Sequence, residues 1–127
     1  MKNKFIIITN NPLVKEELGG LYNVEYLEIS YEDILRTVRD RIYKGHELLT
    51  HPLSGSVKPN ETPYKSIMIS EDIRGLDIKQ MRIIESAIQS CKKFQFKSDQ
   101  YAPQVYEDFQ IVDLTLISSA LPSATAW

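Results

Sequence analysis

A continuous apolar run near the start of the chain limits its fold more than any other feature. Residues 5–8 read Phe-Ile-Ile-Ile without alternation, which is typical of a strand covered on both faces within a parallel sheet. Asn10 and Asn11 follow as helix-capping residues, Pro12 suits a first helical turn, and the glycine pair at 19–20 ends the helix. This order of strand, short loop and helix predicts the opening of a βαβ unit whose first strand lies inside the sheet.

Three later segments have the length and composition of strands. Residues 23–29 alternate apolar and charged side chains, as an edge strand does, whereas 46–50 and 66–70 are short and apolar in the middle. Helices are predicted where Ser30 and Asp77 precede apolar residues spaced three and four apart. Strands that alternate with helices predict an α/β fold: a small three-layer, Rossmann-like domain with a mainly parallel sheet of about four strands and helices on both faces.

The last part of the chain has two readings. Apolar residues recur every three or four positions between 103 and 121, which favours a final helix. Residues 110–117 also fit an alternating strand, so the choice between helix and strand stays open. Residues 122–126 are small and polar, and we expect a frayed tail there.

Composition excludes several classes of function. A chain of 127 residues fits one domain spanning 1–127, and its net charge of −2 gives no general attraction for nucleic acid or an anionic membrane. The apolar run at 5–8 is too short for a signal peptide or membrane span, so we expect a cytoplasmic protein. The single cysteine, Cys91, lies on an apolar helix stripe and is predicted to be buried and unreactive. No cofactor or metal is expected.

A candidate site is predicted at one edge of the sheet, because ligands of such folds bind beyond the carboxyl ends of the strands. The loop at 51–65 contains three prolines and has the length of an ordered functional loop. We expect it to fold back so that Ser54, Ser56 and Lys58 face the same cleft as Asn10 and Asp72. The full set of ligand-binding candidates is Asn10, Asn11, His51, Ser54, Gly55, Ser56, Lys58, Tyr64, Glu71 and Asp72.

The chemistry of these candidates suits an anion. Ser54 and Ser56 supply hydroxyls, Gly55 a flexible backbone N–H, and Lys58 a cation, a set that can hold a phosphate or carboxylate. The spacing of a P-loop and a GxGxxG motif are both missing from the sequence, so no nucleotide class follows.

Two candidates have a competing structural role. His51 either acts as an acid or base, with Glu71 or Asp72 orienting it, or makes hydrogen bonds within the loop. Asn10 and Asn11 either bind a ligand or cap a helix.

One family resemblance extends across the chain. Residues 45–66, which read Gly-His-Glu-Leu-Leu-Thr-His-Pro-Leu-Ser-Gly-Ser-Val-Lys-Pro-Asn-Glu-Thr-Pro-Tyr-Lys-Ser, resemble the GrdX family, as do residues 9–12 and 85–87. The resemblance implies an accessory protein encoded beside glycine reductase, the selenoenzyme system of amino-acid-fermenting anaerobes. It implies no reaction and carries over no catalytic residues.

Three functions therefore remain open. The first is an accessory protein that binds a glycine reductase component or a small anionic metabolite through the loop at 51–65. The second is a small enzyme acting on a phosphorylated or carboxylated substrate, with His51 as acid or base and Lys58 holding the anion. The third is a homo-oligomeric module that associates through the last helix. Whether the protein is an enzyme stays undecided.

Overall fold

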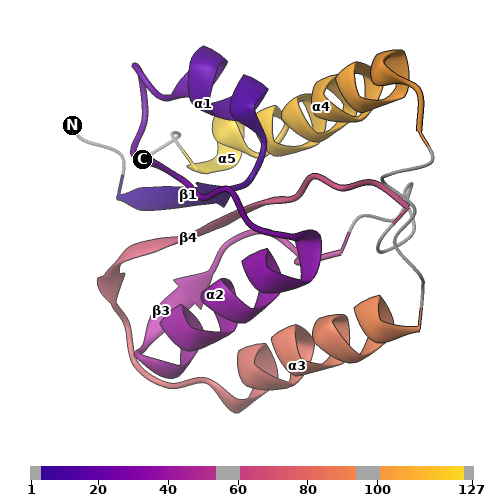
Figure 1. Cartoon of the computed structure of the whole chain (residues 1–127). Helices are drawn as coiled ribbons and strands as arrows, with labels where there is room; N and C mark the ends of the chain where they lie inside the picture. The colour runs from indigo at the N-terminus through magenta and orange to yellow at the C-terminus, as the bar shows by residue number, and fades with distance from the viewer. Residues whose placement is uncertain (1–3, 54–60, 94–100, 125–127) are drawn as a thin grey trace.

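The computed structural model describes residues 4–53, 61–93 and 101–124 (Figure 1). The elements along the chain are β1 (Phe5–Thr9), α1 (Pro12–Leu18), β2 (Val24–Tyr26), α2 (Tyr31–Tyr43), β3 (His46–Leu48), β4 (Ser66–Ile73), α3 (Ile78–Lys92), α4 (Pro103–Ser118) and α5 (Leu121–Ala124). The last long segment is thus a helix, and the alternative reading of a strand there is wrong.

The helices begin where their capping residues predict. The side chain of Asn11 accepts a hydrogen bond from the backbone N–H of Leu13, and Pro12 occupies the first turn of α1. Ser30 accepts in the same way at the start of α2, and Asp77 at the start of α3. Each side chain satisfies a backbone donor that has no partner within its helix, which fixes the helix start.

The sheet is mixed, and the prediction of a mainly parallel sheet is wrong. The strand order is β2-β1-β4-β3, with β1 parallel to β2 and β4 antiparallel to both of its neighbours. Strands β1, β2 and β3 therefore run in one direction and β4 runs against them. The positions of β1 inside the sheet and β2 at its edge are confirmed.

The connection between β3 and β4 explains the reversal. Parallel neighbours need a long crossover, usually a helix, whereas antiparallel neighbours need only a loop. The chain passes from β3 to β4 without an intervening helix in the described residues. The long connection between these strands interrupts the regular alternation of strand and helix, on which the prediction of a parallel sheet rested.

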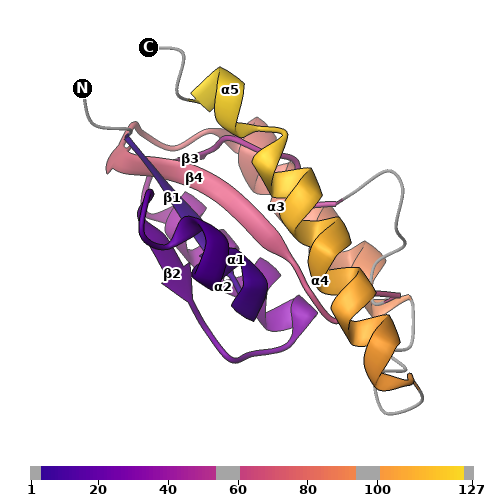
Figure 2. The same ribbon diagram turned by 90° about the horizontal axis from the view of Figure 1, so that it is seen from above.

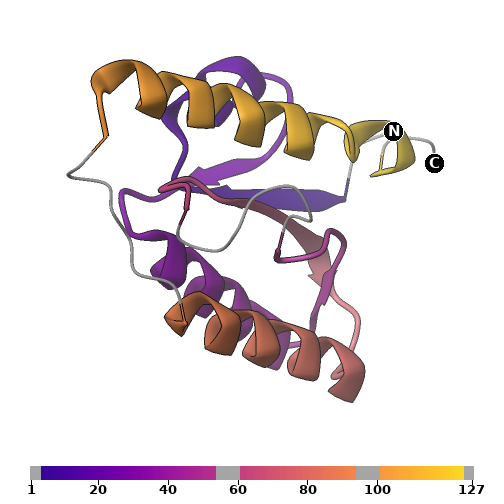
Figure 3. The same ribbon diagram turned by 90° about the vertical axis from the view of Figure 1, so that its right-hand side faces the viewer.

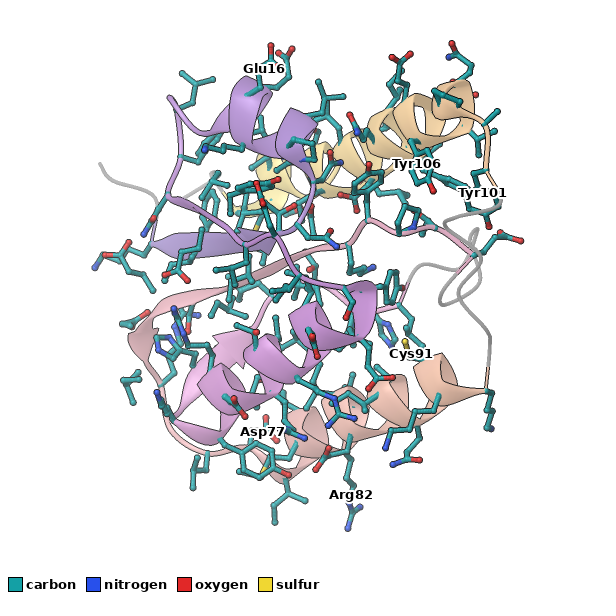
Figure 4. All side chains as sticks on the ribbon, viewed as in Figure 1. Glu16, Asp77, Arg82, Cys91, Tyr101 and Tyr106 are labelled. Atoms are coloured by element: carbon teal, nitrogen blue, oxygen red, sulfur yellow. The ribbon has the colours of Figure 1, made fainter. Side chains whose placement is uncertain are left out.

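Helices lie on both faces of the sheet, as Figures 1 and 3 show. Side chains alternate along β1: Ile6 and Ile8 pack in the cluster that contains α2 and α3, whereas Phe5 and Ile7 pack with residues of α1 and α4. The apolar run at 5–8 is buried throughout because each face of its strand has its own helices. Cys91 lies fully buried in the first of these clusters, as predicted, and Figure 4 places it toward the end of α3.

The prediction of a frayed tail at 122–126 is wrong for residues 122–124, and residues 125–126 lie outside the described part of the chain. Leu121–Ala124 forms the short helix α5, and Leu121 and Ala124 pack against the cluster that contains Phe5 and Ile7. Figure 2 shows α5 continuing beyond the end of α4. Among the described residues, no helix combines the length and the apolar character needed to cross a bilayer.

Candidate functional site

The carboxyl ends of β1, β2 and β3 meet the amino end of β4 at one edge of the sheet, because β4 runs the opposite way. Thr9, the last residue of β1, pairs with Ser66, the first residue of β4, and their hydroxyl oxygens lie 2.7 Å apart. The residues just after β1 and just before β4 are thereby brought together. We call this the polar edge of the sheet.

A buried carboxylate from α4 completes the polar edge. Asp113 is only 6% exposed, and its oxygens accept three hydrogen bonds: from the Ser66 backbone N–H at 3.1 Å, the Ser66 hydroxyl at 2.7 Å and the Asn11 amide at 3.0 Å. Burial raises the pKa of Asp113, whereas the hydrogen bonds from Ser66 and Asn11 and the charge of Lys65 act in the opposite direction.

The hydroxyl groups of Thr9 and Ser66 form a chain of hydrogen bonds that ends at Asp113. The Ser66 hydroxyl donates its only hydrogen to a carboxyl oxygen of Asp113. The contact between Ser66 and Thr9 is therefore donated by Thr9, whose oxygen in turn accepts from the Asn11 backbone N–H at 2.9 Å. Each bond in such a chain polarises the next, which favours one arrangement of the network.

Asn10 holds the segment that precedes β4. Its amide nitrogen donates to the carbonyl oxygens of Ile29 and Pro63 at 2.9 and 2.8 Å, and its amide oxygen accepts from the Lys65 backbone N–H at 2.8 Å. Both amide hydrogens of Asn10 are thus committed within the protein. The amide of Asn11 is committed as well, to Asp113 and to the carbonyl of Gln110, which agrees with its capping role.

The ammonium group of Lys65 has fewer polar contacts than the other polar side chains at this edge of the sheet. The residue is only 6% exposed, and the described residues offer its ammonium group neither a hydrogen bond nor an ion pair. Burial lowers the pKa of Lys65, and the charge of Asp113 opposes that shift.

Two hollows meet at Lys65. The smaller has a volume of about 10 Å³, roughly the space of one water molecule. It is lined by Tyr31, Thr62, Tyr64, Lys65, Phe109, Val112, Asp113 and Leu116. The larger hollow is open, with a volume of about 260 Å³. It is lined by Thr50, His51, Leu53, Lys65, Ser66, Asp113, Leu116, Ile117, Ser119 and Ala120.

The segment around Lys65 is held from several sides. The amide of Gln110 donates to the Tyr64 hydroxyl at 2.9 Å, and the Tyr101 hydroxyl donates to the carbonyl of Glu61 at 2.6 Å. The ring of Tyr101 packs against Tyr106 at a centroid distance of 5.9 Å, and Figure 4 shows the two residues at the start of α4. These contacts fix residues 61–65 against α4 and so fix the position of Lys65.

His51 lies at the rim of the larger hollow. Its Nδ1 atom lies 3.1 Å from both the backbone nitrogen and the carbonyl oxygen of Leu53, which is the loop role that sequence analysis left open. The imidazole ring therefore borders the larger hollow with its Nδ1 side engaged by the loop.

Glu71 and Asp72 lie at the opposite end of β4, which corrects two expectations. The backbone N–H of Glu71 bonds to the carbonyl of Lys4, before β1, and the Asp72 carboxylate accepts from Arg74 at 3.1 Å. Neither residue can orient His51, and Asp72 does not share a cleft with Asn10. The cause is the antiparallel direction of β4, which carries its carboxyl end to the far edge of the sheet.

Four predicted candidates, Ser54, Gly55, Ser56 and Lys58, lie outside the described residues. Of the others, Asn10, Asn11, His51 and Tyr64 gather at the polar edge, where Tyr64 lines the smaller hollow.

Sequence reasoning did not select Lys65, Ser66 or Asp113 as candidates, although these residues form the centre of the site together with Thr9. Asp113 carried a detectable signal, because it stands four residues from both Phe109 and Ile117 in a helix whose spacing is otherwise apolar. An acid at such a position must either face solvent or find buried partners. In α4 the buried residues are Asp113 and Ile117, whereas Val112 and Leu116, both in the expected apolar pattern, are exposed.

Comparison with known proteins gave a family match that covers nearly the whole chain. Neither the curated proteins nor the solved structures gave a match. The family model described as GrdX-like protein matches residues 6–122. That range contains every residue of the polar edge. The chain belongs to the GrdX-like family.

Proposed function

We propose that the protein is a cytoplasmic accessory protein of the glycine reductase system that binds a small anionic metabolite in the larger hollow. The observation that carries the proposal is the ammonium of Lys65, which is nearly buried and has no partner among the described residues. A buried charge without a partner is costly, and an anion that enters the hollow offsets that cost. Family membership and the context implied by the resemblance support the link to glycine reductase.

Asp113 leaves Lys65 available to a ligand. A carboxylate beside an ammonium would ordinarily close on it as an ion pair. Asp113 is instead held by three donors from Ser66 and Asn11. These contacts keep the carboxylate in place, so that the ammonium remains open to the hollow.

The volume and lining of the larger hollow favour a small carboxylate. Binding sites for drug-sized ligands have volumes of roughly 300–1,000 Å³, and this hollow measures about 260 Å³. The Thr50 hydroxyl accepts from the backbone N–H of Met68 and keeps its own hydrogen for donation. With the Lys65 amine, it provides donors for the two oxygens of a carboxylate, and the ring of His51 borders the same hollow.

Binding is tested by thermal shift and calorimetry with acetate, lactate, pyruvate and inorganic phosphate. Lys65→Met should weaken binding of the best anion by on the order of 1–3 kcal/mol, because a charge-assisted contact is lost. Lys79→Met, which removes an exposed lysine of α3, is the matched control and should bind like the wild type. Equal binding by the wild type and Lys65→Met, or no binding of any anion, would contradict the proposal.

The link to glycine reductase is tested separately. Affinity-tagged protein is recovered from a native host that ferments glycine, and the associated proteins and small molecules are identified by mass spectrometry. Enrichment of glycine reductase components over an untagged culture supports the link. Their absence, with the anion still bound, would leave the binding function and remove the proposed context.

A further inference from the structure

We infer that Lys65 is an amine nucleophile that forms an imine with a small 2-oxo acid bound in the larger hollow. The inference rests on the proposed function, since it takes the anion to be a carboxylate and adds a carbonyl group beside it. It goes further by assigning Lys65 a covalent step in place of simple attraction.

The first support is the position of the amine. Lys65 is one of three residues that line both hollows, with Asp113 and Leu116, and so its side chain lies at their junction. The smaller hollow is lined largely by apolar and aromatic groups, including Tyr31 and Phe109. A lysine nitrogen in such surroundings is poorly hydrated, which favours the neutral, nucleophilic form.

The second support is that no described residue occupies the amine. An ammonium engaged in a tight ion pair would be both protonated and blocked. Among the described residues, the side chain of Lys65 has no such pair, whereas its backbone N–H is fixed by Asn10 at 2.8 Å. The main chain is therefore held while the amine stays available, which is the arrangement that a nucleophile requires.

The third support is the carboxyl group of Asp113, a residue that lines both hollows together with Lys65. The carboxylate of Asp113 accepts two hydrogen bonds at one oxygen and one at the other, so one oxygen retains an unused acceptor position. A protonated imine carries the same positive charge as the ammonium that it replaces. Asp113 stabilises that charge without moving, because Ser66 and Asn11 already hold it.

The step balances without any further reactant. The lone pair of the Lys65 nitrogen forms a bond to the carbonyl carbon, and the carbonyl oxygen takes up a proton to give a carbinolamine. The C–O bond then breaks and the oxygen leaves as water after receiving a second proton. Overall, the ammonium and the carbonyl give a protonated imine and one water, whose two hydrogens come from the nitrogen.

The test is trapping of the imine by reduction. Folded protein is incubated at neutral pH with pyruvate and sodium cyanoborohydride, and the modified lysines are located by peptide mass spectrometry. We expect Lys65 to be modified at least about tenfold faster than the exposed Lys79 and Lys92, because the fold desolvates its amine. In denaturant this preference should disappear, since all the lysines then react alike.

Two controls separate this inference from the proposed function. Lactate has the charge and size of pyruvate but no carbonyl, so it should stabilise the protein without giving an adduct. Lys65→Arg removes the primary amine and should lose the adduct, which ties the modification to this residue. Lactate binding without preferential modification of Lys65 would overturn the imine step and leave the anion-binding function intact. A preference that persists in denaturant would overturn it as well.

Discussion

The hydroxyl of Ser66 donates to the carboxylate of Asp113 at 2.7 Å, although 47 residues separate the two along the chain. This contact joins the first residue of β4 to the middle of α4. The same carboxylate also receives the amide of Asn11, which caps α1. One buried side chain thus connects two helices and the central strands of the sheet.

Replacement of Asp113 should therefore destabilise the protein. Asp113→Ala leaves the buried backbone N–H of Ser66 without an acceptor, and we expect a loss of on the order of 2–4 kcal/mol in the free energy of unfolding. Asp113→Asn keeps one oxygen and should fall between this variant and the wild type. Urea denaturation measures the series, with Glu107→Ala on the exposed side of α4 as control. An Asp113→Ala protein as stable as the wild type would contradict the role of the network.

Lys65 should make stability depend on pH in the alkaline range. Burial lowers its pKa in the folded state, whereas the unfolded chain has the ordinary lysine value of about 10.4. Between these two values the unfolded chain holds a proton that the folded chain has released, so the free energy of unfolding rises with pH. This gain in the free energy of unfolding is fully present above the pKa that Lys65 has in the unfolded chain. It is lost as the pH falls through the pKa that Lys65 has in the folded protein.

Lys65→Met removes this dependence. The stability of the wild type relative to Lys65→Met should increase from neutral pH toward about pH 10, because only the wild type carries the titrating amine. Burial raises the pKa of Tyr31, but Tyr31 is present in both proteins and its contribution cancels in the difference. Chemical denaturation at several pH values gives the comparison, and parallel curves for the two proteins would argue against a shifted lysine.

Three glycines in different connections allow a graded test of backbone strain and steric space. Gly45 has φ +103°, and a Cβ there would lie 2.7 Å from a methyl carbon of Ile73, so Gly45→Ala should cost on the order of 1–3 kcal/mol. Gly75 has φ +106° but open space around it, and its alanine variant should suffer backbone strain alone. Gly20→Ala meets neither obstacle and is the control. Thermal unfolding should rank the three in this order, and equal effects would contradict it.

Cys91 should be protected by the fold. Its side chain is fully buried between α2 and α3, so a thiol reagent should label native protein slowly and denatured protein rapidly. The time course of labelling, followed by mass spectrometry with and without denaturant, measures the ratio. Rapid labelling of native protein would show that this part of the core opens readily.

Local features of the chain were predictable from sequence because they depend on neighbouring residues. Asn11, Ser30 and Asp77 cap the helices that they precede, and the apolar run at 5–8 forms an interior strand. The direction of β4 was not predictable in this way. A short apolar strand such as Ser66–Ile69 pairs equally well in either direction, and only its placement against β1 decides between them.

The same distinction between local and long-range features applies to the residues of the candidate site. Asn10 and Asn11 were found because they follow β1 directly, and Tyr64 because it stands in the long loop. Glu71 and Asp72 were misplaced because their position depends on the direction of β4. Asp113 was missed because its partners are distant in sequence, so that no local pattern connects it with Asn11 or Ser66.

The central position of β4 affects how the chain reaches its native state during synthesis. A ribosome releases β1, α1, β2, α2 and β3 first, yet β3 pairs with the sheet only through β4. Until Ser66–Ile73 emerges, the inner side of β1 and the whole of β3 present unpaired backbone groups. Such edges can pair with other chains, and contacts between distant segments form slowly. The nascent protein therefore remains prone to aggregation until the fourth strand enters the middle of the sheet.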